Sequence, residues 1–498
     1  MLTSSAPSSP LAPSYSRADW QGGYASQPQE MEYPITDIEG QVPPDLKGTL
    51  FRNGPGLLDI HGQRIHHPFD GDGMVCQFTF QNSAVHFRNR YVRTEEYVAE
   101  QAAGKILYRG VFGTQKPGGW LANIFDLKMK KIANTNVLYW NDRLWALWEG
   151  SEPYRLDPHT LETLGIDRLD GLLAENQPFT AHPRIDPGSP STKGEPRLVA
   201  FSVKTGPSSS ITIYEFDPRG QVVQQQTRTI PGFAFLHDFA LTEHYCIFFQ
   251  NPVTLNPLPF LFGLQGPGQC LQFQKQQPTK AIVIPRDPAQ TMQVLETKAC
   301  FVFHHANAFE VPNPDHPSGL PNLLVDSICY DSLPVVNPKA DYLDIDFDQL
   351  DSGLLWRSTL NLQAQTVERR CWSDRCVEFP SLQPALVGKR ARYYYMGAAH
   401  HPHGNAPLQA IVKLDLETGQ ETVRSFAPRS FANEPIFVPH PQGQAEDEGW
   451  VLGFNYNAER HCSDLVILNA QTLETEAILH LKQHIPYGLH GTFVATLA

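Results

Sequence analysis

A short hairpin signature recurs along the chain and constrains its fold more than any other feature. An alternating apolar strand ends at Asp or Asn, a short turn follows, and a second alternating strand begins. The anchors are Asp157, Asp217, Asn361, Asp415 and Asn469, with spacings of 60, 144, 54 and 54 residues. Asp and Asn favour such turns because their side chains bond to the turn backbone. A repeat of this length, built of short strands, predicts an all-β propeller with enlarged blades.

Four histidines stand in separate apolar or aromatic stretches, at His182, His237, His304 and His490. They are 55, 67 and 186 residues apart, and the last spacing equals three steps of 62. Equivalent positions on the innermost strands of different propeller blades converge on the central axis. The spacing therefore favours a shared site, although a single buried histidine can equally be an ordinary core residue.

Charge and cysteine usage limit the class of protein. The formal net charge is −13, which lacks the basic surface that nucleic-acid binding requires. The eight cysteines include no Cys-x-x-Cys pair and no secretory segment opens the chain, so we expect a reduced, cytoplasmic protein. The Ser-, Pro- and Ala-rich residues 1–16 are predicted to be a disordered tail, and 17–498 a single domain.

One apolar stretch has no counterpart elsewhere. No charged residue occurs between Tyr245 and Gln274, and four prolines in this stretch exclude a membrane-spanning helix. Residues 254–264 are its most apolar part. We expect them either to touch a membrane surface peripherally, admitting a lipophilic substrate, or to form a buried connection.

Several short motifs stand in a consistent order from about Asp37 to His490. They are Phe51-Arg52-Asn53-Gly54-Pro55, His67 to Met74, Ala133-Asn134-Thr135-Asn136, the four histidine signatures and Asn433 to Pro439. Together they resemble the motifs of the carotenoid cleavage oxygenase family, particularly its bacterial members that cleave apocarotenoids. The resemblance implies a seven-bladed β-propeller, with a dome of loops and short helices over a central iron site.

The resemblance also implies which residues hold the metal. One Fe(II) per chain would be bound by His182, His237, His304 and His490. His304 is chosen over His305 because it follows the Phe of the family's Phe-His-x-x-Asn-Ala motif, and adjacent strand residues face opposite ways. Imidazoles bind several divalent metals, so the assignment of iron depends only on the resemblance to the family. For the same reason of alternation, Asp238 is expected to face away from His237.

Further roles follow from the resemblance. Carboxylates that accept the outer ring N–H groups of the ligands would fix their tautomers and offset the metal charge. These are Glu149, Glu378 and Glu434. Thr135 would crowd one vacant coordination position. The residues expected to line the substrate tunnel are Phe69, Phe112, Trp148, Phe303 and Tyr330.

The implied reaction is oxidative cleavage by O2 of the central (15,15′) double bond of apocarotenals or apocarotenols, giving retinal and a shorter aldehyde product. In such a reaction the metal and O2 carry the chemistry, while the protein supplies shape and orientation. Two alternatives use the same scaffold, namely stilbene cleavage and retinoid isomerisation. A third is a non-enzymatic propeller that binds partners on one face.

Overall fold

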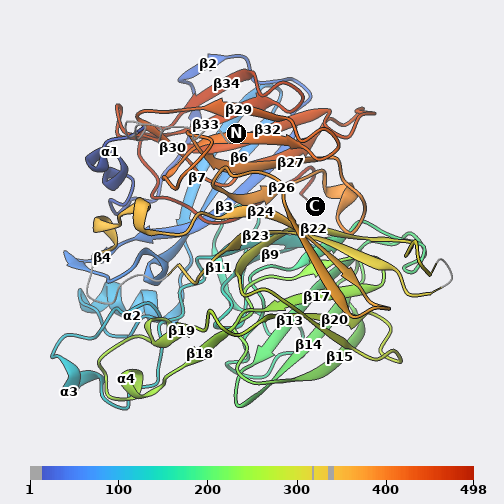
Figure 1. Ribbon diagram of the computed structural model, residues 1–498. Coiled ribbons are helices and arrows are strands. Elements are labelled where there is room, and N and C mark those ends of the chain that lie inside the picture. The colour runs from blue at the N-terminus through green and yellow to red at the C-terminus, as the bar shows by residue number, and fades with distance from the viewer. Residues whose placement is uncertain (1–13, 317–318, 335–340, 498) are drawn as a thin grey trace, which may run out of the picture.

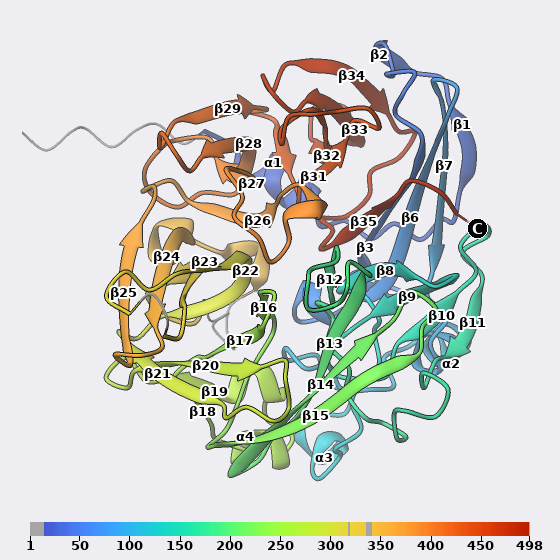
Figure 2. The ribbon, with the colours of Figure 1, turned by 90° about the vertical axis from the view of Figure 1, so that its right-hand side faces the viewer.

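The computed structural model describes residues 14–316, 319–334 and 341–497. Seven antiparallel sheets of four or more strands form a ring around a central axis, as Figure 2 shows, and Figure 1 views the ring from the side. The predicted seven-bladed β-propeller is confirmed. We number the blades in the order in which the chain forms them.

Each blade is a sheet whose strands follow one another from the axis outward. In this order, blade 1 contains β35 (Gly491–Val494), β3 (Gly48–Leu57), β6 (Asp72–Gln81), β7 (Ala84–Tyr91) and β1 (Glu32–Ile35). Blade 2 contains β8 (Asn136–Trp140), β9 (Arg143–Leu147), β10 (Tyr154–Leu156) and β11 (Thr163–Ile166). Blade 3 contains β12 (Arg184–Asp186), β13 (Arg197–Lys204), β14 (Ser208–Phe216) and β15 (Val222–Pro231). Blade 4 contains β16 (Ala240–Leu241), β17 (Tyr245–Gln250), β20 (Thr279–Pro285) and β21 (Gln293–Thr297).

The remaining blades follow the same plan. Blade 5 contains β22 (Phe301–Val311), β23 (Asn322–Tyr330), β24 (Leu354–Asn361) and β25 (Thr366–Cys371). Blade 6 contains β26 (Val377–Ser381), β27 (Tyr393–Ala399), β28 (Leu408–Asp415) and β29 (Glu421–Ser425). Blade 7 contains β30 (Ser430–Ala432) and β31 (Ile436–Pro439), which both pair with β32 (Gly449–Asn457), then β33 (Cys462–Asn469), β34 (Thr475–His480) and β2 (Ile38–Gly40).

Both ends of the chain close the ring. The N-terminal strand β2 completes the outside of blade 7, where Ile38 pairs with Leu479. The C-terminal strand β35 completes the inside of blade 1, where Leu50 pairs with Phe493. The first and last blades are thus each built from both ends of the sequence, and this long-range pairing has no local sequence signal.

The five predicted hairpins are present and occupy equivalent positions. Each joins the third and fourth strands of its blade, counted from the axis, in blades 2, 3, 5, 6 and 7. In each turn the anchor side-chain oxygen accepts backbone N–H bonds, as Asp415 Oδ1 does from Glu417 at 2.9 Å. Asn469 Oδ1 likewise accepts from Gln471 at 3.0 Å. Side-chain bonding within the turn is the reason for the repeated Asp or Asn.

Seven hydrophobic clusters fill the seven interfaces between neighbouring blades. Successive residues of a strand point to opposite faces, so each strand supplies two clusters. In β13, Val199 and Phe201 pack towards blade 4, whereas Leu198 and Ala200 pack towards blade 2. Because the blades are buried on both faces, the sequences of their central strands are continuous apolar runs.

Short helices gather on one face of the ring, at the left of Figure 1. The α-helices there are α1 (Arg17–Gly22), α2 (Glu95–Ala103), α3 (Trp120–Asn123) and α4 (Leu258–Leu261), with the strands β4 (Asp59–Ile60), β5 (Gln63–Arg64), β18 (Val253–Leu255) and β19 (Leu271–Phe273). The single-turn helices are η1 (Pro68–Asp70), η2 (Pro267–Cys270), η3 (Tyr342–Asp344), η4 (Phe347–Gln349) and η5 (Pro384–Leu386).

Two sequence expectations concern the domain boundary. Of the predicted tail 1–16, residues 1–13 lie outside the described residues. Within the described part, Ser14 Oγ donates to Gln409 at 2.7 Å, and Ser16 caps α1. The division into a tail and the single domain 17–498 stays a prediction.

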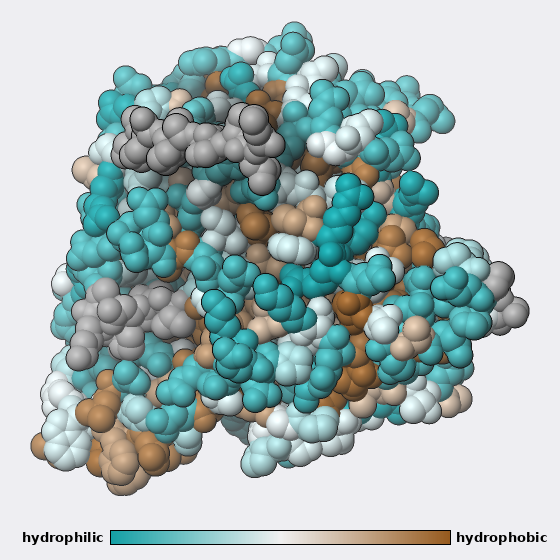
Figure 3. All heavy atoms as spheres, viewed as in Figure 1, coloured by the Kyte–Doolittle hydropathy of each residue, from teal (hydrophilic) through white to brown (hydrophobic). Residues whose placement is uncertain are grey.

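Exposed apolar side chains form a corner of the molecule around α3 and α4. We call this the apolar corner; its residues are Trp120, Leu121, Phe125, Leu127, Leu258, Phe262 and Leu264, each at least 45% exposed. Phe125 packs against Phe262 with ring centroids 6.1 Å apart. Figure 3 shows hydrophobic surface at the lower left, where Figure 1 draws α3 and α4.

Candidate metal centre

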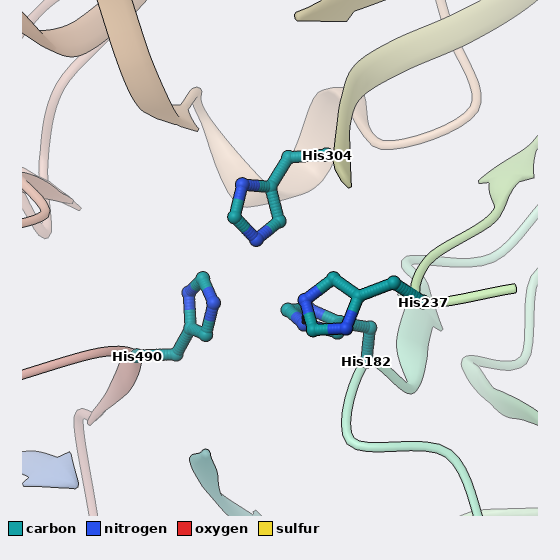
Figure 4. A group of neighbouring side chains, drawn as sticks. All are labelled: His182, His237, His304 and His490. Atoms are coloured by element: carbon teal, nitrogen blue, oxygen red, sulfur yellow. Dashed lines mark hydrogen bonds between the residues drawn. The ribbon is translucent and has the colours of Figure 1, made fainter. Parts of the chain in front are cut away.

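The four predicted histidines converge at the centre of the ring. His182 precedes β12, His237 precedes β16, His490 precedes β35, and His304 lies near the start of β22. Each is therefore at the beginning of the innermost strand of its blade. Figure 4 shows the four imidazoles directed towards a common point from separate parts of the chain. This convergence agrees with the sequence spacing, since the 186 residues between His304 and His490 span three blades.

The arrangement fits a metal ion. One ring nitrogen from each histidine lies within 4.8 Å of those of the other three. The Nε2 atoms of His182 and His237 are 2.9 Å apart. His304 Nε2 is buried and has no hydrogen-bond partner among the described residues. A buried nitrogen without a partner is costly, and a cation at this point would satisfy it.

Three glutamates orient three of the rings through the other ring nitrogen. Glu149 Oε1 lies 2.9 Å from His237 Nδ1, and Glu434 Oε1 lies 2.8 Å from His490 Nδ1. Glu378 Oε2 lies 2.5 Å from His304 Nδ1. A carboxylate acceptor keeps the proton on Nδ1 and leaves the Nε2 lone pair for a metal.

His182 differs from the other three rings, because none of the three glutamates bonds to it in the described structure. Burial, followed by the neighbouring His237 and His490 rings, holds its pKa well below the usual range. The imidazole is therefore neutral at physiological pH. A neutral ring with a free lone pair is the form that binds metals.

The glutamates remain ionised despite their burial. Burial opposes ionisation of Glu378, but the adjacent His304 outweighs it and lowers the carboxyl pKa. Burial also lowers the pKa of His304, yet the Glu378 charge reverses the direction and raises it. Burial raises and His490 lowers the pKa of Glu434, which is lowered overall. The centre thus places ionised carboxylates beside imidazole rings that are either neutral or paired with one of these carboxylates.

Arg52 completes the charge balance. Its Nη1 donates to Glu434 Oε2 at 2.7 Å, and both side chains are almost fully buried. Three carboxylates and one guanidinium leave a net charge of −2 around the four imidazoles. A divalent cation neutralises this charge, so the donor set and its surroundings suit a metal in the 2+ state.

Residues of two sequence motifs hold the inner strands of blades 1 and 2 against each other. Asn53 Nδ2 donates to the carbonyls of Ala133 at 2.9 Å and Asn136 at 2.8 Å. Gly54 lets β3 approach the chain before His490, because an added Cβ would lie 2.6 Å from the Cα of Gly488. These contacts set the position of the segment that carries His490.

Thr135 occupies the equivalent position in blade 2, immediately before β8. Its carbonyl accepts from the backbone N–H of His490 at 3.2 Å, and its Oγ1 donates to Asn134 Oδ1 at 3.2 Å. With Glu378 in β26 and Glu434 before β31, every blade contributes one residue at this level: four histidines, two glutamates and one threonine.

The neighbours of the ligands adopt the structural roles expected for them. Asp238 faces away from the centre, and its Oδ2 accepts from Arg184 at 2.6 Å and from the backbone of His305 at 2.8 Å. His305 Nδ1 bonds to Ser327 Oγ at 2.7 Å. Neither residue points at the four-histidine cluster, which leaves His304 as the member of the pair that does.

The aromatic residues predicted to line a tunnel form two contacting pairs and one separate residue. Phe303 contacts the His237 ring at 5.6 Å and Tyr330 at 6.0 Å. Phe69, in η1, packs against Phe112 with ring centroids 5.4 Å apart. Trp148 is buried beside Glu149. Their role towards a substrate stays a prediction.

Sequence reasoning missed Phe379, whose ring lies against two of the four histidines. Its ring centroid is 5.5 Å from His304 and 5.3 Å from His490. Its φ of 58° is in the left-handed region, unusual for a bulky residue and frequent at functional sites. Its backbone N–H also donates to Glu378 Oε2 at 2.6 Å. No local sequence signal marks such a conformation.

Comparison with known proteins identifies the family. Residues 24–495 match the family described as retinal pigment epithelial membrane protein. The apocarotenoid-15,15′-oxygenase of Synechocystis is 56% identical over 499 residues, covering 100% of both chains. The chain belongs to the carotenoid oxygenase family.

Members of the carotenoid oxygenase family in solved structures share the same fold. The crystal structure of the cobalt-substituted Synechocystis enzyme superposes with a TM-score of 0.94 at 56% identity, covering 97% of this chain and 100% of that one. A more distant member, lignostilbene-α,β-dioxygenase isozyme III of Sphingomonas paucimobilis, is 29% identical over 94% of this chain and 95% of its own. Within the described residues, no helix has the length and hydropathy of a membrane span.

Proposed function

We propose that this chain is a non-haem Fe(II) dioxygenase that cleaves the 15,15′ double bond of apocarotenals or apocarotenols, giving retinal and a shorter aldehyde. The observation that carries the proposal is full-length identity of 56% to an apocarotenoid-15,15′-oxygenase, combined with four convergent imidazoles. The lignostilbene-cleaving relative is only 29% identical, which makes stilbene cleavage the weaker candidate.

We propose iron as the metal of this site. His182, His237, His304 and His490 would hold one Fe(II), and the net charge of their surroundings suits a divalent ion. The cobalt-substituted relative supports a transition-metal site of the same kind. When bound, ferrous iron would supply the one-electron chemistry that O2 needs in order to react with a closed-shell polyene.

The protein's own residues would prepare the site for this reaction. Glu149, Glu378 and Glu434 hold the proton of three rings on Nδ1, so that Nε2 faces the metal. Thr135 would crowd one coordination position with its side chain, leaving space for O2 and substrate elsewhere. No protein acid or base is required, and catalysis would rest on orientation and exclusion of water.

The substrate would reach the centre along aromatic side chains. Phe303 lies next to the His237 ring and contacts Tyr330, and Phe69, Phe112 and Trp148 would extend the apolar lining. An all-carbon polyene offers no polar group along its length, so aromatic walls can position it only by shape and contact area.

The apolar corner would bring the enzyme to its lipophilic substrate. Residues 254–264 supply Leu258, Phe262 and Leu264, and the sequence around α3 adds a second apolar segment. Large exposed apolar patches mark contact sites for membranes or partners. We assign this corner to peripheral contact with a membrane surface, from which an apocarotenoid could be drawn.

Product analysis tests the proposed reaction. The Fe(II)-loaded protein is incubated aerobically with a long apocarotenal in detergent, and the products are separated by chromatography and weighed by mass spectrometry. Retinal with a complementary shorter dialdehyde supports 15,15′ cleavage. Aldehydes of other lengths would contradict the assigned bond, and turnover of a stilbene in place of the apocarotenal would favour the alternative reaction.

A further inference from the structure

The side chain of Asn134 is buried next to Thr135 and uses all of its polar groups. Its Nδ2 donates to the carbonyl of Gly71 at 2.8 Å and to that of Phe69 at 3.2 Å. Its Oδ1 accepts from Thr135 Oγ1 at 3.2 Å. The amide has one orientation, because turning it over would set its oxygen against two carbonyl oxygens. Asn134 is only 1% exposed, so no orientation is compensated by solvent.

The backbone of Thr135 is fixed from two sides. Its N–H donates to the carbonyl of Leu147 at 3.0 Å, and its own carbonyl accepts from His490 N at 3.2 Å. Leu147 stands two residues before Glu149, so both contacts are with segments that carry members of the four-histidine centre or its carboxylates. With the backbone held in this way, rotation about χ1 is the remaining freedom of the Thr135 side chain.

This rotation decides which group Thr135 presents in each direction. Its Cβ carries a hydroxyl, a methyl group and a hydrogen, and the staggered rotamers exchange their places. A hydroxyl oxygen can bind a divalent cation, whereas a methyl group cannot. The χ1 rotamer of Thr135 therefore determines whether its side chain blocks a coordination position or supplies a ligand to it.

The bond to Asn134 selects one rotamer. It is the only hydrogen bond of the Thr135 hydroxyl among the described residues. A buried hydroxyl that gave up this bond would lose its partner, which is unfavourable. With the oxygen directed at Asn134, only the methyl group and the hydrogen of Cβ are left for the other directions.

We propose that Asn134 is a positioning residue that holds the Thr135 hydroxyl away from the metal and couples this rotamer to the loop that carries Phe69. The inference rests on the proposed function, in which Thr135 crowds one coordination position. Phe69 lies in η1 and Gly71 follows that helix directly, so the same amide fixes both the loop and Thr135. Asn134 acts through Thr135 and is not itself a catalytic residue.

The absorption spectrum of Co(II) bound to the full-length protein tests this role without turnover. The visible bands of Co(II) weaken when its coordination number rises to six. In Asn134→Ala the hydroxyl is released and can turn to the metal, so we expect weaker bands than in wild type at equal bound cobalt. Thr135→Val has no hydroxyl and keeps the branched shape. It should show the wild-type spectrum, both alone and combined with Asn134→Ala.

Asn123→Ala is the matched control for the loss of a buried amide. Asn123 Nδ2 donates to the carbonyls of Lys116 at 2.9 Å and Gly119 at 2.8 Å, and its Oδ1 accepts from Lys116 N at 2.9 Å. It thus makes the same number of bonds as Asn134, but all of them are to backbone in the region of α3. The Co(II) spectrum of Asn123→Ala should equal that of wild type.

Three results would overturn the inference. They are an unchanged spectrum in cobalt-loaded Asn134→Ala, weakened bands in the combined variant, and an altered spectrum in Thr135→Val alone. The last needs no change at Asn134, so it decides the question even where Asn134→Ala does not fold. A wild-type protein that binds no Co(II) would instead contradict the proposed metal centre, and this inference with it. Failure to cleave an apocarotenoid would appear only in the product analysis.

Discussion

At the scale of single residues, the proposed metal centre depends on groups that would not contact the metal. His237, His304 and His490 each direct one nitrogen inward because a glutamate engages the other. The carboxylates fix ring orientation and supply the negative charge that a buried cation requires. Their loss should therefore weaken metal binding before it alters the fold.

Glu378→Gln tests this role. The amide can still accept from His304 Nδ1 but carries no charge, so the affinity for Co(II) or Fe(II) should fall about 10- to 100-fold. Metal titration by calorimetry measures the change. Glu310→Gln is the matched control, since Glu310 bonds His244 Nδ1 at 2.9 Å outside the centre. Equal affinities for both variants would contradict the assigned role.

Arg52 and Glu434 form a buried pair whose partners depend on each other. Arg52→Met leaves the Glu434 carboxylate without its cation and should lower the free energy of unfolding by about 3–5 kcal/mol. Arg52→Met combined with Glu434→Gln should cost less than the sum of the single substitutions. Urea denaturation of the metal-free variants gives this coupling, and strict additivity would show that the pair is not coupled.

His67 should make stability depend on pH. Burial lowers its pKa to about 3, and its Nδ1 accepts from Phe69 N at 3.1 Å, which requires the neutral ring. The unfolded chain binds the proton below about pH 6.5, so folding stability falls as the pH drops from there towards 3. Thermal melts at pH 7 and 5 should show a smaller loss for His67→Asn than for wild type. A larger loss in His67→Asn would contradict this account.

At the scale of elements, the apolar corner is assembled from two separate segments. The loop around α3 and the insertion around α4 are joined by Arg109, whose guanidinium donates to the carbonyls of Asp126 at 2.7 Å and Gln265 at 2.8 Å. The sequence indicated the second segment through its lack of charge. The first was missed, because Lys128 and Asp126 interrupt its apolar pattern.

Charges placed on this corner should reduce membrane binding. Leu121→Glu combined with Leu264→Glu removes two exposed leucines, and fully burying one such side chain contributes about 1.5–3 kcal/mol. Partition into phosphatidylcholine vesicles, measured by flotation, should fall at least tenfold. Val423→Glu alters an exposed apolar residue in blade 6 and should leave binding unchanged. Unaltered flotation of the double variant would rule out this surface as the contact.

At the scale of the whole molecule, one positional rule explains the site. The beginning of each innermost strand faces the axis. The spacing of His182, His237 and His304 along the sequence therefore indicated that they belong to successive blades. Turn anchors such as Asp217 made the blade repeat visible. In blade 4 the turn between β20 and β21 also holds an anchor, Asp287, whose Oδ1 accepts from Ala289 N at 2.9 Å, but the sequence pattern did not reveal it. The pairings of β2 with β34 and of β35 with β3 join distant parts of the chain, which local patterns do not encode. The conformation of Phe379 was equally invisible.

Retinal formation by three proteins treated with Fe(II) tests the central claim most directly. Wild type, His304→Ala and His305→Ala are reconstituted with Fe(II), assayed for bound iron, and incubated aerobically with the same apocarotenal. We predict that wild type and His305→Ala bind iron and release retinal, whereas His304→Ala binds little iron and releases none. Retinal from His304→Ala, or its loss only in His305→Ala, would contradict the assignment of the four-histidine centre.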